Sequence, residues 1–188
     1  MARVAINGFG RIGRLFFRQV FANPSHASLQ IVAINDLTDS ENLAYLLQHD
    51  TVYWGYGKKV TTGIENDATY LVVDGKKILL TQEKDPAQLP WARLGIDIVV
   101  EATGLFESFA AASAHITAGA KRVVIAAPAK EEDGVGGKTV LMGVNEHELK
   151  TCTVTSNGSC TTNAASPVAF LMAQSIGVKK AILSTVHG

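Results

Sequence analysis

A cysteine between a polar turn and an expected helix is the residue of this sequence best placed for covalent chemistry. Residues 156–163 read SNGSCTTN, and Cys160 stands directly before an apolar, helix-like segment. The partial positive charge at a helix N-terminus favours the thiolate, which is the nucleophilic form of cysteine. Neighbouring hydroxyls and backbone amides could hold an oxyanion or a phosphate. A small buried cysteine is the common alternative, and the local sequence favours neither interpretation over the other.

His187 is the candidate base for this thiol. It follows the apolar segment 181–186, at the kind of strand end where functional groups are common. A Cys–His pair is a standard way to activate a thiol. A surface histidine at a strand end is an equally good interpretation from the sequence alone. The other histidines have no spacing typical of a metal site, so we expect no metal.

Three glycines form a second motif near the N-terminus. Gly8, Gly10 and Gly13 make the pattern G-x-G-x-x-G between an expected strand at 3–7 and an expected helix at 11–22. The first glycine allows a tight turn, the second allows backbone to approach a pyrophosphate, and the third allows close helix–strand packing. Free amides at the helix start attract phosphates. The motif therefore predicts a dinucleotide-binding turn, with a purely structural glycine turn as the alternative.

Asp36 supports the dinucleotide interpretation. It ends the second expected strand, 29–34, at about 20 residues after the glycines, where a carboxylate binds the adenosine ribose hydroxyls. A carboxylate there also repels a 2′-phosphate, which favours NAD over NADP. The alternative is an ordinary turn aspartate. By contrast, Gly137-Lys138-Thr139 is not expected to be a nucleoside-triphosphate loop, because Glu132 stands where that motif needs glycine.

The remaining pattern indicates elements that could position these groups. We expect helices at 40–48, with Ser40 as a possible N-cap, at 106–118 and at 160–176. A hairpin is expected at 69–80 around Asp74-Gly75. Further strands are expected at 97–100, 121–127, 139–144, 151–155 and 179–186. The alternation of strands and helices predicts an α/β fold with a parallel sheet.

Composition excludes several classes of function. Of the 188 residues 47% are hydrophobic, and 17 Lys and Arg balance 17 Asp and Glu, so we expect neither a nucleic-acid nor a membrane partner. No apolar stretch approaches the roughly 20 residues of a membrane helix. The N-terminus is not typical of a signal peptide, because Asn7 and Gly8 interrupt its apolar run. Two cysteines do not make a disulfide framework, so we expect a cytoplasmic protein.

Taken together, these segments resemble the phosphorylating glyceraldehyde-3-phosphate dehydrogenases. The similar segments follow in the family's order: 5–14 (AINGFGRIGR), 34–37 (INDL), 101–106 (EATGLF), 118–121 (AGAK), 127–130 (APAK), 156–163 (SNGSCTTN) and 185–187 (TVH). The resemblance implies a Rossmann-type doubly wound, mostly parallel NAD-binding domain at 1–156. It also implies that 157–188 is the start of a truncated α+β catalytic domain.

The resemblance implies a reaction and a set of binding residues. Cys160 would attack the aldehyde of glyceraldehyde 3-phosphate, His187 would accept the proton, and inorganic phosphate would release 1,3-bisphosphoglycerate from the thioester. Ser159 and Thr161 match positions that contact that phosphate. The family's cofactor positions match Asn7, Phe9, Gly10, Arg11, Ile12, Asn35, Asp36, Lys84, Thr103, Gly104 and Ala127. Family members are typically cytoplasmic homotetramers of glycolysis and gluconeogenesis.

The sequence departs from the family in several places. Gly158 stands where alanine is more common, Ala164 replaces a second cysteine, Lys84 replaces an arginine, and 49–60 is atypical. Family members continue far beyond the position of Gly188, so we expect this chain to have little activity alone and to expose apolar surface. Two alternatives stay open: erythrose-4-phosphate dehydrogenase, although residues 127–130 favour the glyceraldehyde enzyme, and a non-catalytic NAD-binding or assembly module.

Overall fold

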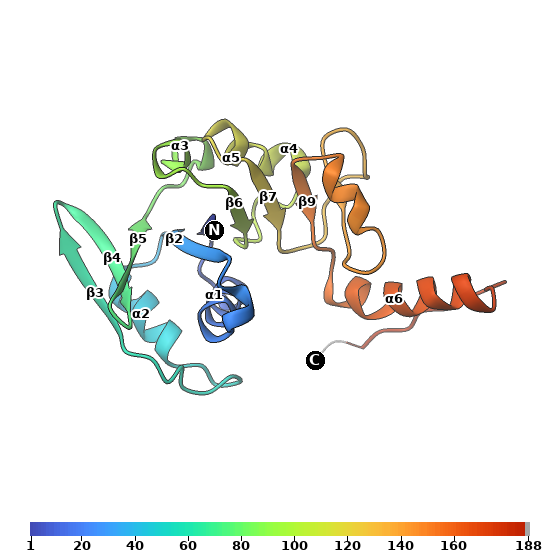
Figure 1. Ribbon diagram of the computed structural model, residues 1–188, viewed down its shortest axis with the longest axis horizontal. Coiled ribbons are helices and arrows are strands. Elements are labelled where there is room, and N and C mark those ends of the chain that lie inside the picture. The colour runs from blue at the N-terminus through green and yellow to red at the C-terminus, as the bar shows by residue number, and fades with distance from the viewer. Residues whose placement is uncertain (187–188) are drawn as a thin grey trace.

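A nine-stranded, mostly parallel sheet forms the centre of residues 1–186, the part of the chain that the computed structural model describes (Figure 1). The strand order is β3-β4-β5-β2-β1-β6-β7-β9-β8. Only the pairs β3–β4 and β4–β5 are antiparallel. The strands are β1 (Ala2–Asn7), β2 (Leu29–Asn35), β3 (Val60–Glu65), β4 (Ala68–Val73), β5 (Lys76–Thr81), β6 (Ile98–Glu101), β7 (Arg122–Ile125), β8 (Lys138–Thr139) and β9 (Val154–Ser156). The expected Rossmann-type fold is confirmed.

The order of the strands creates a place for a ligand. β1 pairs with β2 on one side and with β6 on the other, both in parallel. From β1 the chain therefore continues with β2 toward one edge of the sheet. It later returns to the other side of β1 with β6 and continues toward the opposite edge. Ligands of open α/β sheets bind at the carboxyl ends of the strands where the order reverses in this way. The residues that follow β1, β2 and β6 thus surround the expected crevice.

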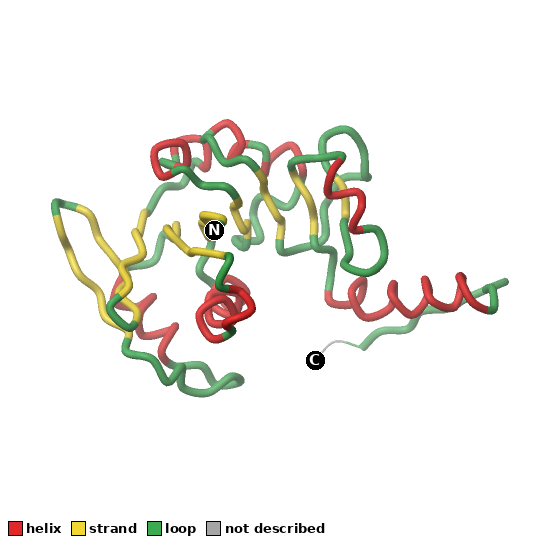
Figure 2. The backbone as a smooth tube through the Cα atoms, viewed as in Figure 1, coloured by secondary structure: helices red, strands yellow, loops and turns green. Residues whose placement is uncertain are grey.

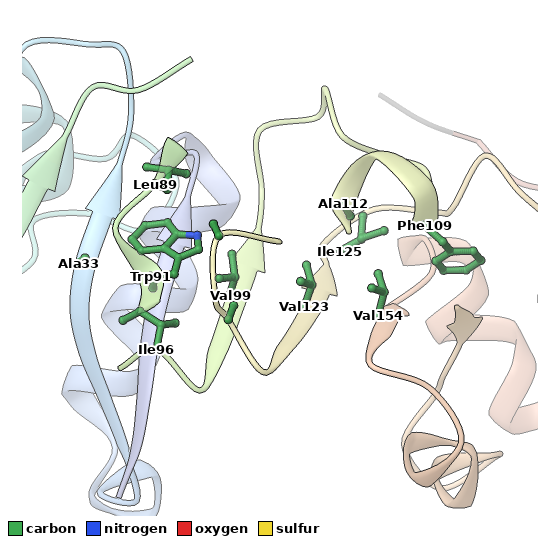
Figure 3. Close-up of a cluster of buried hydrophobic side chains, with 13 residues drawn as sticks. Ala33, Leu89, Trp91, Ile96, Val99, Phe109, Ala112, Val123, Ile125 and Val154 are labelled. Carbon is green, nitrogen blue, oxygen red and sulfur yellow. The ribbon is translucent and has the colours of Figure 1, made fainter. Parts of the chain in front are cut away.

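Helices cover both faces of the sheet. Neighbouring strand residues point to opposite faces, so apolar strands need a covering layer on each side. Helices α1 (Arg11–Ala22) and α2 (Ser40–Gln48) lie on one side, and α3 (Trp91–Leu94), α4 (Phe109–Ala112) and α5 (Ala114–Thr117) lie on the other (Figures 1 and 2). Ile6 of β1 belongs to the buried cluster that contains Phe17 of α1. Its neighbour Ala5 belongs to a second cluster around Trp91 and Val99, part of which Figure 3 shows. Burial of both faces explains why these strands are nearly all apolar.

The structure agrees with the expected bounds of two helices, but it differs from one expected N-cap and divides one expected helix. The bounds of α1 and α2 agree with the expected 11–22 and 40–48. Ser40 is not the cap of α2; Asp39 is, since its carboxylate accepts a hydrogen bond from the Asn42 amide at 2.8 Å. The expected helix at 106–118 is instead the two short helices α4 and α5, interrupted at Ser113. The Ser113 hydroxyl donates to the Phe109 carbonyl at 2.7 Å, a local bond that competes with regular helix geometry.

Two strand predictions differ from the structure, and one strand was not predicted. The hairpin β4–β5 around Asp74-Gly75 is confirmed, but its neighbour β3 was not predicted. The apolar segment 139–144 is mostly turn, and only β8 at its start pairs with β9. Residues 179–186 form no strand within the described part of the chain, because a strand needs a partner and no described segment pairs with them.

Helix α6 (Cys160–Ser175) stands apart from the layered region, beyond the β9 end of the sheet (Figure 1). None of its residues is buried, and its apolar side chains Val168, Leu171 and Met172 are exposed. The expectation of exposed apolar surface is therefore confirmed for this helix. Within residues 1–186, no helix has the length and apolar character needed to span a membrane.

Candidate functional site

The glycine turn between β1 and α1 is packed too closely for side chains at two of its three glycines. Gly8 has a φ of +90°, and a Cβ there would lie 2.6 Å from the backbone nitrogen of Thr103. A Cβ at Gly13 would lie 2.2 Å from the carbonyl oxygen of Gly8. A Cβ at Gly10 would meet no atom within 4 Å. The first and third glycines therefore serve packing, whereas the second faces open space, as a ligand-facing position requires.

The first turn of α1 offers unpaired backbone donors. Gly10 is the N-cap, and no side chain caps the helix. The exposed residues Arg11 and Ile12 begin the helix, so its first amides face the crevice side of the turn without a protein acceptor from a capping side chain. A helix start of this kind attracts phosphate oxygens through its free N–H groups and its dipole.

Asp36 lies directly beside the glycine turn, as the sequence predicted. Its carboxylate accepts a hydrogen bond from the Phe9 amide at 2.7 Å and another from the Thr38 amide at 2.9 Å. The side chain is half-buried at the end of β2. These two bonds hold the carboxylate at the edge of the crevice, where it can still accept from a ligand hydroxyl.

Two adjoining pockets lie along the carboxyl ends of the strands. The larger has a volume of about 430 Å³, and the smaller about 170 Å³; Ala102, Thr103 and Phe106 line both. Of the predicted cofactor residues, the larger pocket is lined by Asn7, Gly10, Asn35, Asp36, Lys84 and Thr103. The smaller is lined by Ile12, Thr103, Gly104 and Ala127. Phe9 and Arg11 line neither: Phe9 is buried beneath the turn and Arg11 is exposed.

A buried polar network underlies these pockets, and sequence reasoning missed part of it. Asn7 donates to Glu101 at 2.6 Å and accepts from Asn35 at 2.7 Å. Glu101 also binds His115 at 2.9 Å, and the His115 ring accepts from Trp91 at 3.0 Å. Asn7 and Asn35 were predicted to bind cofactor, whereas Glu101, His115 and Trp91 were not. The available signal was a charged residue, Glu101, at the end of an otherwise apolar strand.

Cys160 occupies the first position of the sixteen-residue helix α6 and is exposed. Ser159 is the N-cap, since its hydroxyl accepts from the Thr162 amide at 2.9 Å. Asn163 reaches back to bind the carbonyls of Asn157 and Ser159 at 2.7 and 2.9 Å. The turn is thus held from within, and it presents the thiol at the positive end of a helix dipole.

The turn that carries Cys160 is connected to the cofactor crevice through β9, the strand that precedes it. The Ser156 hydroxyl donates to the carbonyl of Ala127 at 2.7 Å, and Ala127 lines the smaller pocket. Cys160, Ser159 and Thr161 do not line either pocket. His187 lies outside the described residues.

The apparent phosphate-loop ending at 137–139 has a structural role. Lys138 is paired with Glu148, and the Thr139 amide donates to Asp133 at 2.8 Å. Both residues belong to the edge strand β8, and a turn rather than a helix follows. With its lysine paired and no helix start behind it, the segment lacks the features that bind nucleoside triphosphates, in agreement with the prediction.

A doubly wound sheet with a glycine turn, an uncapped helix start and a carboxylate at the switch point defines a dinucleotide-binding domain of the Rossmann class. The family model described as "Glyceraldehyde 3-phosphate dehydrogenase, NAD binding domain" matches residues 2–109. The chain belongs to this family, and NAD is the cofactor of its domain.

Curated relatives extend the similarity over the whole chain. It is 46% identical to a glyceraldehyde-3-phosphate dehydrogenase of Thermotoga maritima over 188 residues, which cover 100% of this chain and 54% of the relative. It is 47% identical to one of Zymomonas mobilis over 186 residues, or 98% of this chain and 53% of the relative. A third, from Bacillus subtilis, is 46% identical over 98% of this chain and 52% of its own length. The chain therefore spans about half the length of the curated relatives it matches.

Proposed function

We propose that this chain is the NAD-binding and nucleophile-bearing part of a phosphorylating glyceraldehyde-3-phosphate dehydrogenase. The observation that carries the proposal is the pairing of two motifs in one fold. A dinucleotide crevice lies at the switch point, and an exposed cysteine begins the long helix that follows β9. The identity to dehydrogenases of that name over nearly the whole chain supports the same conclusion.

The residues that line the crevice fit NAD. The uncapped start of α1 would bind the pyrophosphate, and Asp36 would accept from the adenosine ribose hydroxyls. Leu37 and Leu105 offer exposed apolar surface on the rim of the larger pocket for the flat adenine ring. When bound, NAD supplies the acceptor for the hydride that leaves the substrate.

The proposed chemistry of the chain's own residues begins at Cys160. Its thiolate adds to the aldehyde carbon and forms a carbon–sulfur bond, while the carbonyl oxygen receives the thiol's proton by way of His187. His187 then accepts the proton of this hydroxyl as a hydride leaves the carbon and the thioester forms. Inorganic phosphate, held by Ser159 and Thr161, then attacks the thioester carbon and displaces the thiolate. The products are 1,3-bisphosphoglycerate and the regenerated cysteine.

The same proposal divides the chain into two parts. Residues 1–156 would form the NAD-binding domain, and 157–188 would begin the catalytic domain, in agreement with the separation of α6 from the sheet in Figure 1. Because the chain spans about half of its relatives, we propose that turnover requires the part that corresponds to their other half. By resemblance, the whole protein would be a cytoplasmic homotetramer.

Calorimetric titration of the chain with NAD and with NADP tests the first part of the proposal. We expect NAD to bind and NADP to bind at least about tenfold more weakly, because Asp36 repels a 2′-phosphate. Asp36→Asn should weaken NAD binding about tenfold or more, since a hydrogen bond to a charged group is lost. Asp39→Asn is the matched control: it makes the same charge change nearby and preserves the α2 cap. Equal affinity of the Asp36 variant and the parent would contradict the assignment.

Alkylation tests the second part. Iodoacetamide followed by peptide mass spectrometry should modify Cys160 and spare Cys152, which is buried and serves as the internal control. In a protein that carries both halves, Cys160→Ser should abolish phosphorylating oxidation while NAD binding persists. Turnover by that variant at the parent rate would show that another residue is the nucleophile.

A further inference from the structure

The buried network beneath the crevice converges on one carboxylate, and at one end a group that can only donate determines how the neighbouring imidazole is protonated. The Trp91 indole lies in the core (Figure 3) and donates to Nδ1 of His115 at 3.0 Å. Because Nδ1 accepts, the ring proton is on Nε2. Nε2 therefore donates to Oε2 of Glu101 at 2.9 Å. The tautomer of His115 follows from its contact with Trp91.

Glu101 is the point on which the network converges. His115 and the Asn7 amide nitrogen both donate to Oε2, and these two donors lie 3.4 Å apart. The Thr103 backbone amide donates to Oε1 at 2.8 Å, and the Thr103 hydroxyl donates to the same oxygen. The carboxylate is only 2% exposed, and it accepts from all four donors. Such complete satisfaction is what a buried carboxylate requires.

The converging bonds join the two walls of the crevice. Asn7 ends β1, and Thr103 follows β6, so Glu101 connects the strands on either side of the switch point. Asn7 donates to Glu101 through its amide nitrogen, so its carbonyl oxygen is the atom that accepts from Asn35, at 2.7 Å. Asn35 in turn accepts from Thr81 and from the Glu83 amide, both at 2.9 Å. The amide orientations of both asparagines that line the larger pocket are thereby determined.

We propose that Glu101 and His115 are positioning residues of the dinucleotide site, which hold Asn7 and Thr103 in the orientation that binds NAD. Neither of the two lines the larger pocket, and Glu101, which borders the smaller one, is only 2% exposed. They therefore act on the larger pocket through the residues that line it. A buried ionic group is a weak source of stability, because apolar residues of similar volume often stabilise a fold as well. A network of this kind has a further use, because donors held on one buried carboxylate pre-orient the groups that meet a ligand. The inference rests on the binding of NAD proposed above.

Two amide substitutions at His115 separate positioning from packing. His115→Gln can place an amide N–H near the position of Nε2 and preserve the donation to Glu101. His115→Asn can place an acceptor near Nδ1 and preserve only the contact with Trp91. Both variants lose the imidazole ring and replace it with a carboxamide, so a packing role predicts similar losses in both.

The experiment measures NAD affinity by calorimetry for the parent and both variants, after denaturant unfolding has shown that each is folded. We expect His115→Gln to bind NAD within about threefold of the parent and His115→Asn to bind about tenfold more weakly. Nitrogen-15 NMR of the parent imidazole should show the proton on Nε2 in the absence of ligand. In His115→Asn, the Asn7 side-chain amide resonances should shift more than in His115→Gln.

Each outcome bears on the inference. If the parent binds NAD and the two variants bind it with equal affinity, the positioning role is overturned, whereas the proposed function is not. A proton on Nδ1 in the parent would overturn the direction of the network, and with it the inference. A parent that binds no NAD would overturn both this inference and the proposed function.

Discussion

Gly10 and Gly13 belong to the same turn, but their surroundings predict opposite consequences for alanine substitution. A Cβ at position 13 would lie 2.2 Å from the Gly8 carbonyl oxygen and 3.2 Å from a methyl carbon of Ile6. The first of these atoms is backbone, so the clash can be relieved only by moving α1 away from β1. A Cβ at position 10 would meet nothing within 4 Å. Gly13→Ala should therefore perturb the fold, and Gly10→Ala should perturb ligand binding.

The magnitudes follow from these contacts. Overpacking of a close contact costs about 1–3 kcal/mol, and a backbone clash places Gly13→Ala at about 3 kcal/mol of unfolding free energy. For a chain of this size, that loss lowers Tm by roughly 6–12 °C. Gly10 has a φ of −68°, which alanine adopts without strain. Alanine at position 10 lowers the conformational entropy of the unfolded chain, which stabilises the fold by about 0.4–1 kcal/mol. Alanine is also a poorer N-cap than glycine, which costs about 1 kcal/mol, so the two effects nearly cancel in the free energy of unfolding.

Binding should show the reverse order. A methyl group at position 10 occupies the space through which a pyrophosphate approaches the backbone. The loss of one hydrogen bond to a charged group is about 1.5–3 kcal/mol, which corresponds to a Kd for NAD about tenfold to a hundredfold higher. Urea denaturation followed by circular dichroism gives the stability of each variant, and calorimetry gives its affinity. The reasoning is refuted if Gly13→Ala unfolds at the parent's urea midpoint, or if Gly10→Ala binds NAD as tightly as the parent.

Two further predictions concern packing away from the crevice. The buried hydroxyl of Tyr56 has no hydrogen-bond partner among the described residues, and burial raises the pKa of this tyrosine to about 12. The folded pKa is higher than the unfolded value of about 10, so this group's contribution to stability is complete below pH 10 and is lost as the pH rises toward 12. Tyr56→Phe should remove that alkaline loss from unfolding free energies measured between those values, and an unchanged pH dependence would contradict it. Gly137→Ala should lower the free energy of unfolding by about 1–3 kcal/mol, because its Cβ would lie 2.3 Å from the Phe109 ring. Gly136→Ala is the control and should not destabilise, since its Cβ would lie 3.9 Å from Phe109. Equal urea midpoints for these two variants would contradict the prediction.

Elements with strong local signals were predictable from sequence. The helix α1 begins after the glycine turn and ends at Ala22, because Pro24 disfavours helical backbone at Asn23, and both limits agree with the structure. The hairpin β4–β5 was predicted from Asp74-Gly75, whose positive φ values are those a tight two-residue turn requires. Gly8 and Gly13 were predictable for the same reason, because the motif that contains them is short and its geometry is dictated by neighbouring residues. Asp36 was predictable from its position directly after the second strand.

Elements that depend on distant partners were not predictable in this way. Residues 139–144 are apolar like a strand, but Val140 and Leu141 are buried just before a turn, and the Leu141 amide donates to the Asn145 side chain. Apolar character predicts burial, and burial does not require a strand. Strand β3 was missed for the opposite reason: its sequence is polar and lacks clear alternation, and it pairs with β4 through a tight turn at Asn66-Asp67.

The network beneath the crevice shows where sequence reasoning about the site ends. Asn7 and Glu101 are 94 positions apart, and their contact exists only because β1 and β6 pair in parallel at the centre of the sheet. His115 stands in a segment that reads as an ordinary amphipathic helix, and nothing local distinguishes it from a surface histidine. Its role depends on an indole from α3 on one side and a carboxylate from β6 on the other. A motif can thus predict which residues meet the dinucleotide, whereas the residues that orient them become visible only when the topology brings the strands together.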